Sequence, residues 1–319
     1  MNRHIFGPVL SRRLGRSLGI DLLPFKTCTF SCVYCECGAT TNLTTTRSEF
    51  FPASIMVAEL DQVLFKQPDL DYITFAGSGE PTLSLSIGSV ITHIKATYPC
   101  YSVAVLTNGS LCTRADVRND LLMADLIIPT LTTAYQQTFE RIHRPHPSLR
   151  IDAIIAGMEQ FRKMYTGALW LEVFIIPGLN TTADELAGLK GAIERINPDR
   201  IQLNTLDRPS AEGWVQPAPD AELERIREML GRSGIEVISR TFPISRTMVP
   251  DYEVVEMIRV TLCRRPSTIE DLIRTTSISG GELAKILAVL KKAGIVTSQR
   301  GERGVFYTIC RKNNANGDT

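Results

Sequence analysis

The chain has 319 residues, 44% of them hydrophobic and 22% charged, and a formal net charge of +1. This composition is typical of a globular protein of about two domains, and the near-zero charge excludes a chain-wide field for nucleic acid or membranes. Eight cysteines without a signal peptide or long apolar run predict a cytoplasmic protein with free thiols and no membrane partner.

Short apolar runs alternate with helical patterns as far as about residue 240. Strands are predicted at residues 17–25, 72–77, 101–109, 127–131, 169–178, 200–206 and 235–239, and helices at 54–67, 87–98, 118–126, 151–165, 183–196 and 220–234. Repeated strand–helix units indicate a parallel sheet. About six units predict an α/β fold, a partial (β/α)6 parallel barrel over residues 1–245, with reactive groups at the carboxyl ends of the strands.

Three cysteines, Cys28, Cys32 and Cys35, follow the first predicted strand with the spacing CxxxCxxC, and Tyr34 precedes the last. Iron–sulfur clusters normally take four cysteines, so three leave one iron open to a small molecule. Zinc sites and ferredoxin clusters need other spacings. Cys37 is expected to be a bystander, because its separation from Cys35 is awkward for the same cluster.

This motif resembles the signature of the radical S-adenosylmethionine superfamily. The resemblance implies the partial barrel and a [4Fe-4S] cluster on Cys28, Cys32 and Cys35, with S-adenosylmethionine bound to the open iron. It also implies an external reductant such as flavodoxin or ferredoxin. Tyr34 is expected near the adenine.

Polar residues after the second strand form the turn Gly77, Ser78, Gly79 and Glu80. The glycines let the backbone approach a ligand closely, and the carboxylate suits an ammonium group. In the resembling family the equivalent GGEP segment holds the methionine amino group of the cofactor. Here Ser78 replaces the first of the paired glycines.

Later strands carry further candidate contacts to the cofactor. Thr107 and Asn108 end the third strand, where they form a turn or contact ribose or carboxylate. Glu172, Gln202 and Asn204 are polar among apolar neighbours. Buried polar groups need partners, so these three either satisfy the sheet ends or face the adenosyl and substrate pocket.

Residues 6–28 and 129–149 resemble relatives of the tRNA wyosine-forming radical enzymes, and this likeness extends over residues 5–240. That branch usually has an aspartate where this chain has the threonine-rich segment 130–134. No cysteine precedes Cys28 to hold a second cluster, so the carbon-addition chemistry of those enzymes is not expected.

Basic residues near these segments suit an anionic substrate, because guanidinium groups bind phosphate in a fork geometry. They are Arg12, Arg13, Arg16, Arg141, His143, Arg144 and His146. The alternative is a solvated helix end for the arginines and a satisfied hydrogen-bonding role for His143.

Residues 250–312 predict a winged helix, with helices at 252–262, 269–276 and 279–294 and a hairpin at 295–309. Ser279 and Glu282 form a predicted capping box. The basic residues are Lys291, Lys292, Arg300, Arg303, Arg311 and Lys312. They favour nucleic acid as the partner, with protein as the alternative. Residues 313–319 are predicted to be a disordered tail.

The predicted function is reductive cleavage of S-adenosylmethionine and hydrogen abstraction from a substrate, with RNA or tRNA modification foremost. Two alternatives remain. One is a radical enzyme acting on a protein or peptide, and the other is an iron–sulfur redox sensor that binds DNA.

Overall fold

The computed structural model describes residues 4–238, 251–276 and 278–310. The chain divides into an α/β unit, residues 1–242, and a C-terminal unit, residues 243–319. The predicted domain boundaries at 245 and 250, the tail 313–319, and Arg311 and Lys312 lie outside the described residues.

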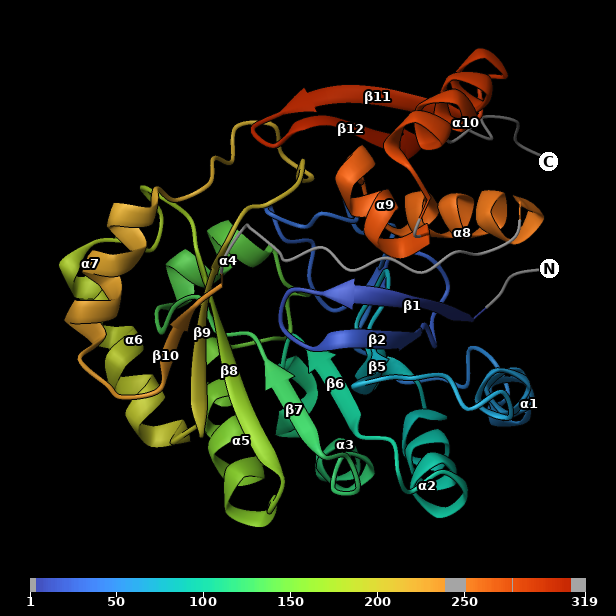
Figure 1. Ribbon diagram of the computed structural model, residues 1–319. Coiled ribbons are helices and arrows are strands. Elements are labelled where there is room, and N and C mark those ends of the chain that lie inside the picture. Colours follow the sequence, from blue (N-terminus) through green and yellow to red (C-terminus); the bar gives the residue numbers. More distant parts are fainter. Residues whose placement is uncertain (1–3, 239–250, 277, 311–319) are drawn as a thin grey trace, which may run out of the picture. The chain divides into compact units, whose positions relative to one another are not determined.

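An eight-stranded sheet forms the α/β unit, in the order β1-β2-β5-β6-β7-β8-β9-β10 (Figure 1). The strands are β1 (Ile5–Ser11), β2 (Gly15–Ile20), β5 (Tyr72–Phe75), β6 (Val103–Thr107), β7 (Leu126–Pro129), β8 (Ala168–Ile175), β9 (Arg200–Thr205) and β10 (Ile235–Val237). Only the β1–β2 pair in this sheet is antiparallel. The predicted α/β fold with a mainly parallel sheet is therefore confirmed.

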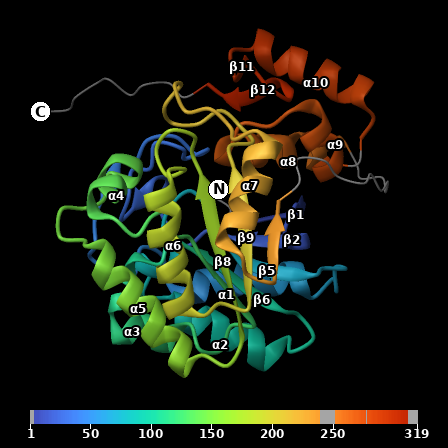
Figure 2. The ribbon, with the colours of Figure 1, turned by 90° about the vertical axis from the view of Figure 1, so that its left-hand side faces the viewer.

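Helices connect the parallel strands and lie along the outer side of the curved sheet (Figures 1 and 2). They are α1 (Ala53–Leu64), α2 (Ile87–Thr97), α3 (Ala115–Asp120), α4 (Gln136–His143), α5 (Ile151–Met164), α6 (Ala183–Ile196) and α7 (Asp220–Leu230). Within the described part of the chain, no helix is long and apolar enough to span a membrane.

The predicted helix at 118–126 is wrong in its bounds, since α3 ends at Asp120 and Leu126 already begins β7. Its apolar run includes Leu122 and Met123, which are 36% and 55% exposed. Exposed apolar residues therefore gave the same sequence pattern as the buried face of a helix. Helix α4 was not predicted, because its eight residues include only two large apolar side chains, Phe139 and Ile142.

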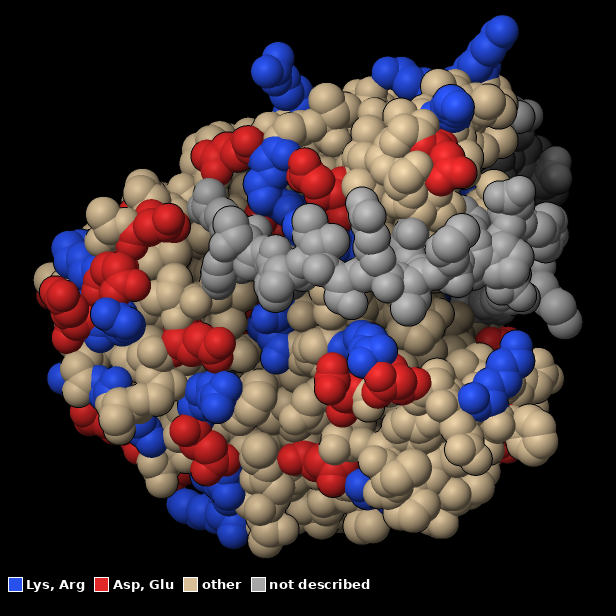
Figure 3. Space-filling model, in the orientation of Figure 1, with Lys and Arg blue, Asp and Glu red and all other residues tan. Residues whose placement is uncertain are grey.

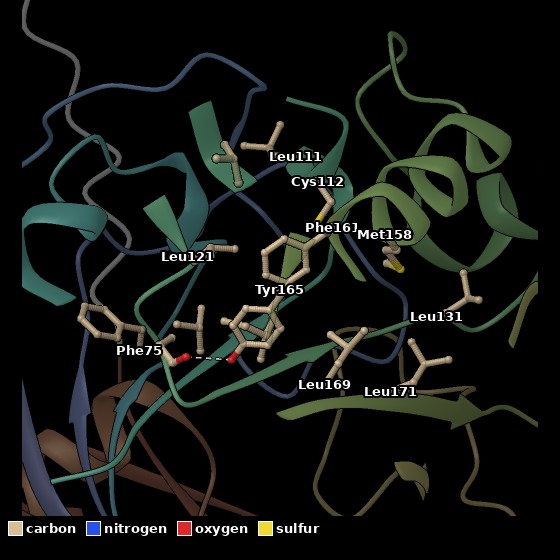
Figure 4. Packing of buried hydrophobic residues seen from close by; sticks show 14 of the residues in the cluster. Phe75, Leu111, Cys112, Leu121, Leu131, Met158, Phe161, Tyr165, Leu169 and Leu171 are labelled. Carbon is tan, nitrogen blue, oxygen red and sulfur yellow. Dashed lines mark hydrogen bonds between the residues drawn. The ribbon is translucent and has the colours of Figure 1, made fainter. Parts of the chain in front are cut away.

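The apolar core of the α/β unit lies between the helices and the outer face of the sheet. Figure 4 shows Tyr165 at the end of α5, packed near Phe161 and Leu169, with its hydroxyl directed at a backbone carbonyl. That hydroxyl donates a hydrogen bond to the Ala124 carbonyl at 2.8 Å. A buried polar group is thereby satisfied inside an otherwise apolar layer.

The β1–β2 hairpin forms one edge of the sheet, where β2 pairs with β5. The predicted strand at 17–25 overlaps β2, but β1 and its pairing were not foreseen from the sequence. Leu14, in the turn of the hairpin, packs with Ala104, Leu126 and Ile128. These strand residues alternate with outward-facing core residues, as the pleat of a strand requires. The hairpin turn thus also brings Arg12 and Arg13 toward β8 and β9.

The C-terminal unit contains α8 (Asp251–Arg264), α9 (Ile269–Thr276), α10 (Gly280–Lys292), β11 (Val296–Gly301) and β12 (Gly304–Ile309). The two strands form an antiparallel hairpin. Three helices and a hairpin thus lie where the sequence predicted them. Ser279 caps α10 by accepting from the Glu282 amide, and its hydroxyl lies 2.8 Å from the Glu282 carboxylate. The predicted N-cap is confirmed.

We expect Tyr165→Phe to lower the free energy of unfolding of the full chain by about 1–3 kcal/mol, because the buried Ala124 carbonyl loses its donor. Urea unfolding followed by circular dichroism measures this. Tyr135→Phe is the matched control: its hydroxyl donates to the Asp184 carbonyl, but the side chain is 44% exposed. Equal effects of the two variants would contradict the assigned role of burial.

Candidate functional site

The cysteine loop begins in the short strand β3 (Thr27–Cys28) and lies against the end of α4. The Ser31 amide donates to the His143 carbonyl and the Val33 amide donates to the Ile142 carbonyl, both at 2.9 Å. The last carbonyls of a helix lack partners within the helix. Here the loop amides supply them, so α4 fixes the backbone that carries the three cysteines.

The three thiols lie close enough to perturb one another electrostatically. Burial raises the pKa of Cys28 to about 12. Burial also raises the pKa of Cys32, and the neighbouring Cys35 and Cys28 add to that effect. The pKa of Cys35 is lowered, first by its hydrogen bond with Cys37 and then by the positive charge of Lys26, both acting against burial.

Lys26 is a site residue that the sequence analysis missed. Its side chain is buried, and its Nζ donates to the Cys35 sulfur at 3.0 Å. Burial alone would lower the pKa of Lys26, but the neighbouring thiols of Cys35, Cys37 and Cys28 together outweigh burial and raise it. A lysine two residues before the first cysteine has no distinctive pattern, so only the folded loop reveals its role.

This donor set fits an iron–sulfur cluster better than a single metal ion. Among the described residues, no three or more His, Cys, Asp or Glu side chains are arranged around one ion. Three neighbouring thiols and a buried cation would suit a larger, negatively charged group such as an iron–sulfur cluster, held by Cys28, Cys32 and Cys35.

The turn at residues 77–80 packs tightly on the cysteine loop. A Cβ on Gly79 would lie 2.0 Å from the Thr27 carbonyl oxygen, and one on Gly77 would lie 2.3 Å from the Asp21 carboxyl carbon. Ser78 donates its amide and its hydroxyl to Asp21, both at 3.2 Å. The glycines therefore serve close contacts within the chain itself.

Glu80 ties this turn to the end of β6. Its Oε1 accepts from the hydroxyls of Thr107 and Thr82, both at 2.6 Å, and its Oε2 accepts from the Asn108 amide at 2.7 Å. The side chain is 2% exposed, and burial raises its pKa. The structure thus brings Glu80, Thr107 and Asn108 together. Contact of this carboxylate with a cofactor ammonium stays a prediction.

A second polar group lies on the inner side of β8 and β9, beside the hairpin turn. Glu172 accepts from Arg13 and Thr130 at 2.6 Å each and from Asn204 at 2.9 Å. Burial alone would raise the pKa of Glu172, but Arg13 and these hydrogen bonds lower it. Gln202 is buried, and its Oε1 has no hydrogen-bond partner among the described residues.

Tyr34 in the cysteine loop and His143 at the end of α4 lie beside each other, with 5.7 Å between ring centroids. The Tyr34 ring stacks on Phe174 with 4.1 Å between centroids. His143 is buried, with Nδ1 3.2 Å from the Cys32 sulfur and Nε2 2.6 Å from the Thr132 hydroxyl. Burial lowers the pKa of His143 to about 3. His143 is thus a satisfied hydrogen-bonding residue, and the threonine-rich segment supplies its partner.

The basic residues predicted to bind an anion do not form one cluster. Four of them pair with carboxylates: Arg12 with Asp207, Arg13 with Glu172, Arg16 with Asp69, and Arg144 with Glu212. Arg141 is exposed, and His146 is hydrogen-bonded to Ser148. The positive charges of Arg12 and Arg13 also lower the pKa of the Glu172 carboxylate.

We expect Gly79→Ala to lower the iron content of the protein after anaerobic reconstitution by more than half, because its Cβ would displace the Thr27 backbone beside Cys28. Gly191→Ala in α6, whose Cβ would meet nothing within 4 Å, is the control. Iron and sulfide analysis measures the effect. Full iron loading of Gly79→Ala would contradict the close contact assigned to this glycine.

Comparisons with known proteins agree with this geometry. The family model described as the radical SAM superfamily matches residues 22–189, a range that includes the cysteine loop and the glycine turn. A crystal structure of a radical SAM methyltransferase from Sphaerobacter thermophilus is similar, with a TM-score of 0.51 and 17% identity. The similarity covers 69% of this chain and 64% of that one, and it shows the fold alone.

Curated relatives are similar over most of this chain. A UPF0026 protein of Methanocaldococcus jannaschii is 31% identical over 284 residues, which cover 86% of this chain and 87% of that protein. A protein of Brachyspira hyodysenteriae named GTPase Obg is 32% identical over 312 residues, 96% of this chain, which spans only 45% of that protein. By the family match and these relatives, the chain belongs to the radical SAM superfamily and to the UPF0026 group of proteins.

Proposed function

We propose that this enzyme reductively cleaves S-adenosylmethionine at a [4Fe-4S] cluster held by Cys28, Cys32 and Cys35, and abstracts hydrogen from a substrate. The observation that carries the proposal is the set of three neighbouring thiols on one loop beside a buried cation. When bound, the cluster supplies the electron that splits S-adenosylmethionine into methionine and a 5′-deoxyadenosyl radical. Flavodoxin or ferredoxin is the proposed reductant.

The chain's own part is to hold and orient S-adenosylmethionine and to exclude water. We assign the contacts to Tyr34, Gly77, Ser78, Gly79, Glu80, Thr107, Asn108, Glu172, Gln202 and Asn204. Tyr34 supplies an aromatic wall beside the thiols. The Glu172 carboxylate stays ionised beside Arg13, so it can accept hydrogen bonds from hydroxyl groups.

We propose RNA as the substrate, selected by the C-terminal unit as a winged helix. The sequence resemblance of residues 6–28 and 129–149 to relatives of the tRNA wyosine-forming enzymes supports this choice. Lys285, Lys292 and Arg300 are exposed in this unit and available to phosphate. On the face seen in Figure 3, acidic and basic side chains are interspersed, so nucleic-acid binding depends on local basic groups.

Arg303 has a structural role that makes it a poor probe of RNA binding. It pairs with Asp271 at 3.2 Å, and its guanidinium lies 5.4 Å from the Phe306 ring centroid. Reversing its charge would disturb the hairpin itself. The exposed Lys292 and Arg300 are better positions for testing phosphate contacts.

We expect Cys28→Ala, Cys32→Ala and Cys35→Ala each to abolish the reduced-cluster paramagnetic signal and 5′-deoxyadenosine formation, because each removes one of the three proposed ligands. Cys37→Ala should retain both. Anaerobic reconstitution with iron analysis, paramagnetic resonance and product chromatography measures the outcome. Cys100→Ala, at an exposed thiol, is the control. Loss of the cluster in Cys37→Ala together with its retention in one of the other three would overturn the ligand assignment.

We expect the double variant Lys292→Glu/Arg300→Glu of the full chain to bind RNA more weakly, with its slope of log affinity against log salt smaller by roughly two. Formation of 5′-deoxyadenosine without substrate should be unchanged. Filter binding of total cellular RNA at several salt concentrations measures the slope.

Lys66→Glu/Lys190→Glu, at two exposed lysines of the α/β unit, is the matched control, because both double variants change the net charge by the same amount. RNA binding that does not depend on salt, or equal losses in the control, would reject RNA as the substrate. Hydrogen abstraction from a peptide and not from RNA would favour the protein-modifying alternative.

A further inference from the structure

Each of the three thiols meets a polar side chain from outside the CxxxCxxC motif. The contacts are Lys26 Nζ to Cys35 Sγ at 3.0 Å, His143 Nδ1 to Cys32 Sγ at 3.2 Å, and Asn108 Nδ2 to Cys28 Sγ at 3.7 Å. They come from the loop before β3, from the end of α4 and from the turn after β6. Three separate segments of the fold thus contribute to the surroundings of the sulfurs.

The His143 contact has a defined direction once Cys32 ligates a metal. A ligating thiolate only accepts hydrogen bonds, so the Nδ1–H of His143 donates to sulfur. Its Nε2 then accepts from the Thr132 hydroxyl, 2.6 Å away. Thr132 therefore fixes the tautomer, as outer partners of metal-site histidines commonly do.

Lys26 differs from the other two donors in its full positive charge. Its side chain is 2% exposed, so water screens that charge little. Besides Cys35, the charge acts on Cys28 and Cys37. Reduction adds negative charge to a cluster, and a buried cation stabilises the reduced form more than the oxidised one. Net charge and hydrogen bonds to sulfur are the means by which proteins set cluster potentials.

We propose that Lys26 is a positioning residue that raises the reduction potential of the cluster by placing a buried positive charge at Cys35, with His143 and Asn108 as weaker neutral donors at the other two thiols. The inference rests on the proposed cluster at Cys28, Cys32 and Cys35. In this proposal, the positive charge of Lys26 beside the Cys35 sulfur helps determine how readily the cluster accepts an electron from the reductant.

The backbone of Lys26 has a separate structural role, which limits the choice of variants. Its carbonyl accepts from the Thr41 and Asn42 amides, and its φ is +56°. β-Branched substitutions would be strained at this backbone conformation. Lys26→Gln removes the charge and keeps a side-chain donor, whereas Lys26→Arg keeps the charge.

The experiment is an anaerobic redox titration of the reconstituted full chain without S-adenosylmethionine, followed by paramagnetic resonance. At the wild-type midpoint, Lys26→Gln should show at least a tenfold lower ratio of reduced to oxidised cluster, a shift of about 59 mV for one electron. Lys26→Arg should stay within about threefold of wild type, because it retains the charge. An unshifted Lys26→Gln, or equal shifts in both variants, overturns the inference.

Asn108→Asp provides an independent variant if Lys26→Gln holds no iron. It places a negative charge beside Cys28, while its Oδ1 still accepts from the Ser110 amide at 3.0 Å. A fall in potential of the same sign supports the inference, and an unshifted potential overturns it. Wild-type protein without a cluster overturns the proposed function as well, so the two failures are distinguishable.

Discussion

A single buried carboxylate, that of Glu80, holds together the segments on which the site depends. The carboxylate oxygens accept hydrogen bonds from Thr107 and Asn108 at the end of β6. The backbone amide of Glu80 donates to the carbonyl of Thr27, next to Cys28. Burying a carboxylate is costly unless it is hydrogen-bonded, and here several donors offset that cost. The cysteine loop, the glycine turn and the sheet end therefore keep one arrangement.

The Arg13–Glu172 pair and the cysteine thiols beside Lys26 differ in how positive and negative charges are arranged. On the inner side of β8 and β9, Arg13 and Glu172 neutralise each other directly. At the thiols, Lys26 is a buried cation whose partners are sulfur atoms. A group with negative charge completes that environment. The proposed cluster site and the Arg13–Glu172 pair thus have separate electrostatic arrangements.

Errors in the sequence-based predictions have definite physical causes. The helix at 118–126 was misplaced because Leu122 and Met123 are apolar but exposed. The β1–β2 hairpin was missed because its first strand has only one buried residue, Ile5, and so shows little apolar pattern. The arginines of the hairpin were candidates for substrate contact or for a solvated helix end. Arg12 and Arg13 instead pair with Asp207 and Glu172 within the fold, and substrate contact stays a prediction.

Local features were determined by the sequence itself: the spacing of Cys28, Cys32 and Cys35, the glycine turn, and the strand–helix alternation that predicts a parallel sheet. Only the tertiary structure decided which side chains meet the sulfurs. His143 is 111 residues from Cys32, and Asn108 is 80 residues from Cys28. Periodicity reports which residues are buried, but contacts over such separations depend on how α4 and the end of β6 pack against the cysteine loop.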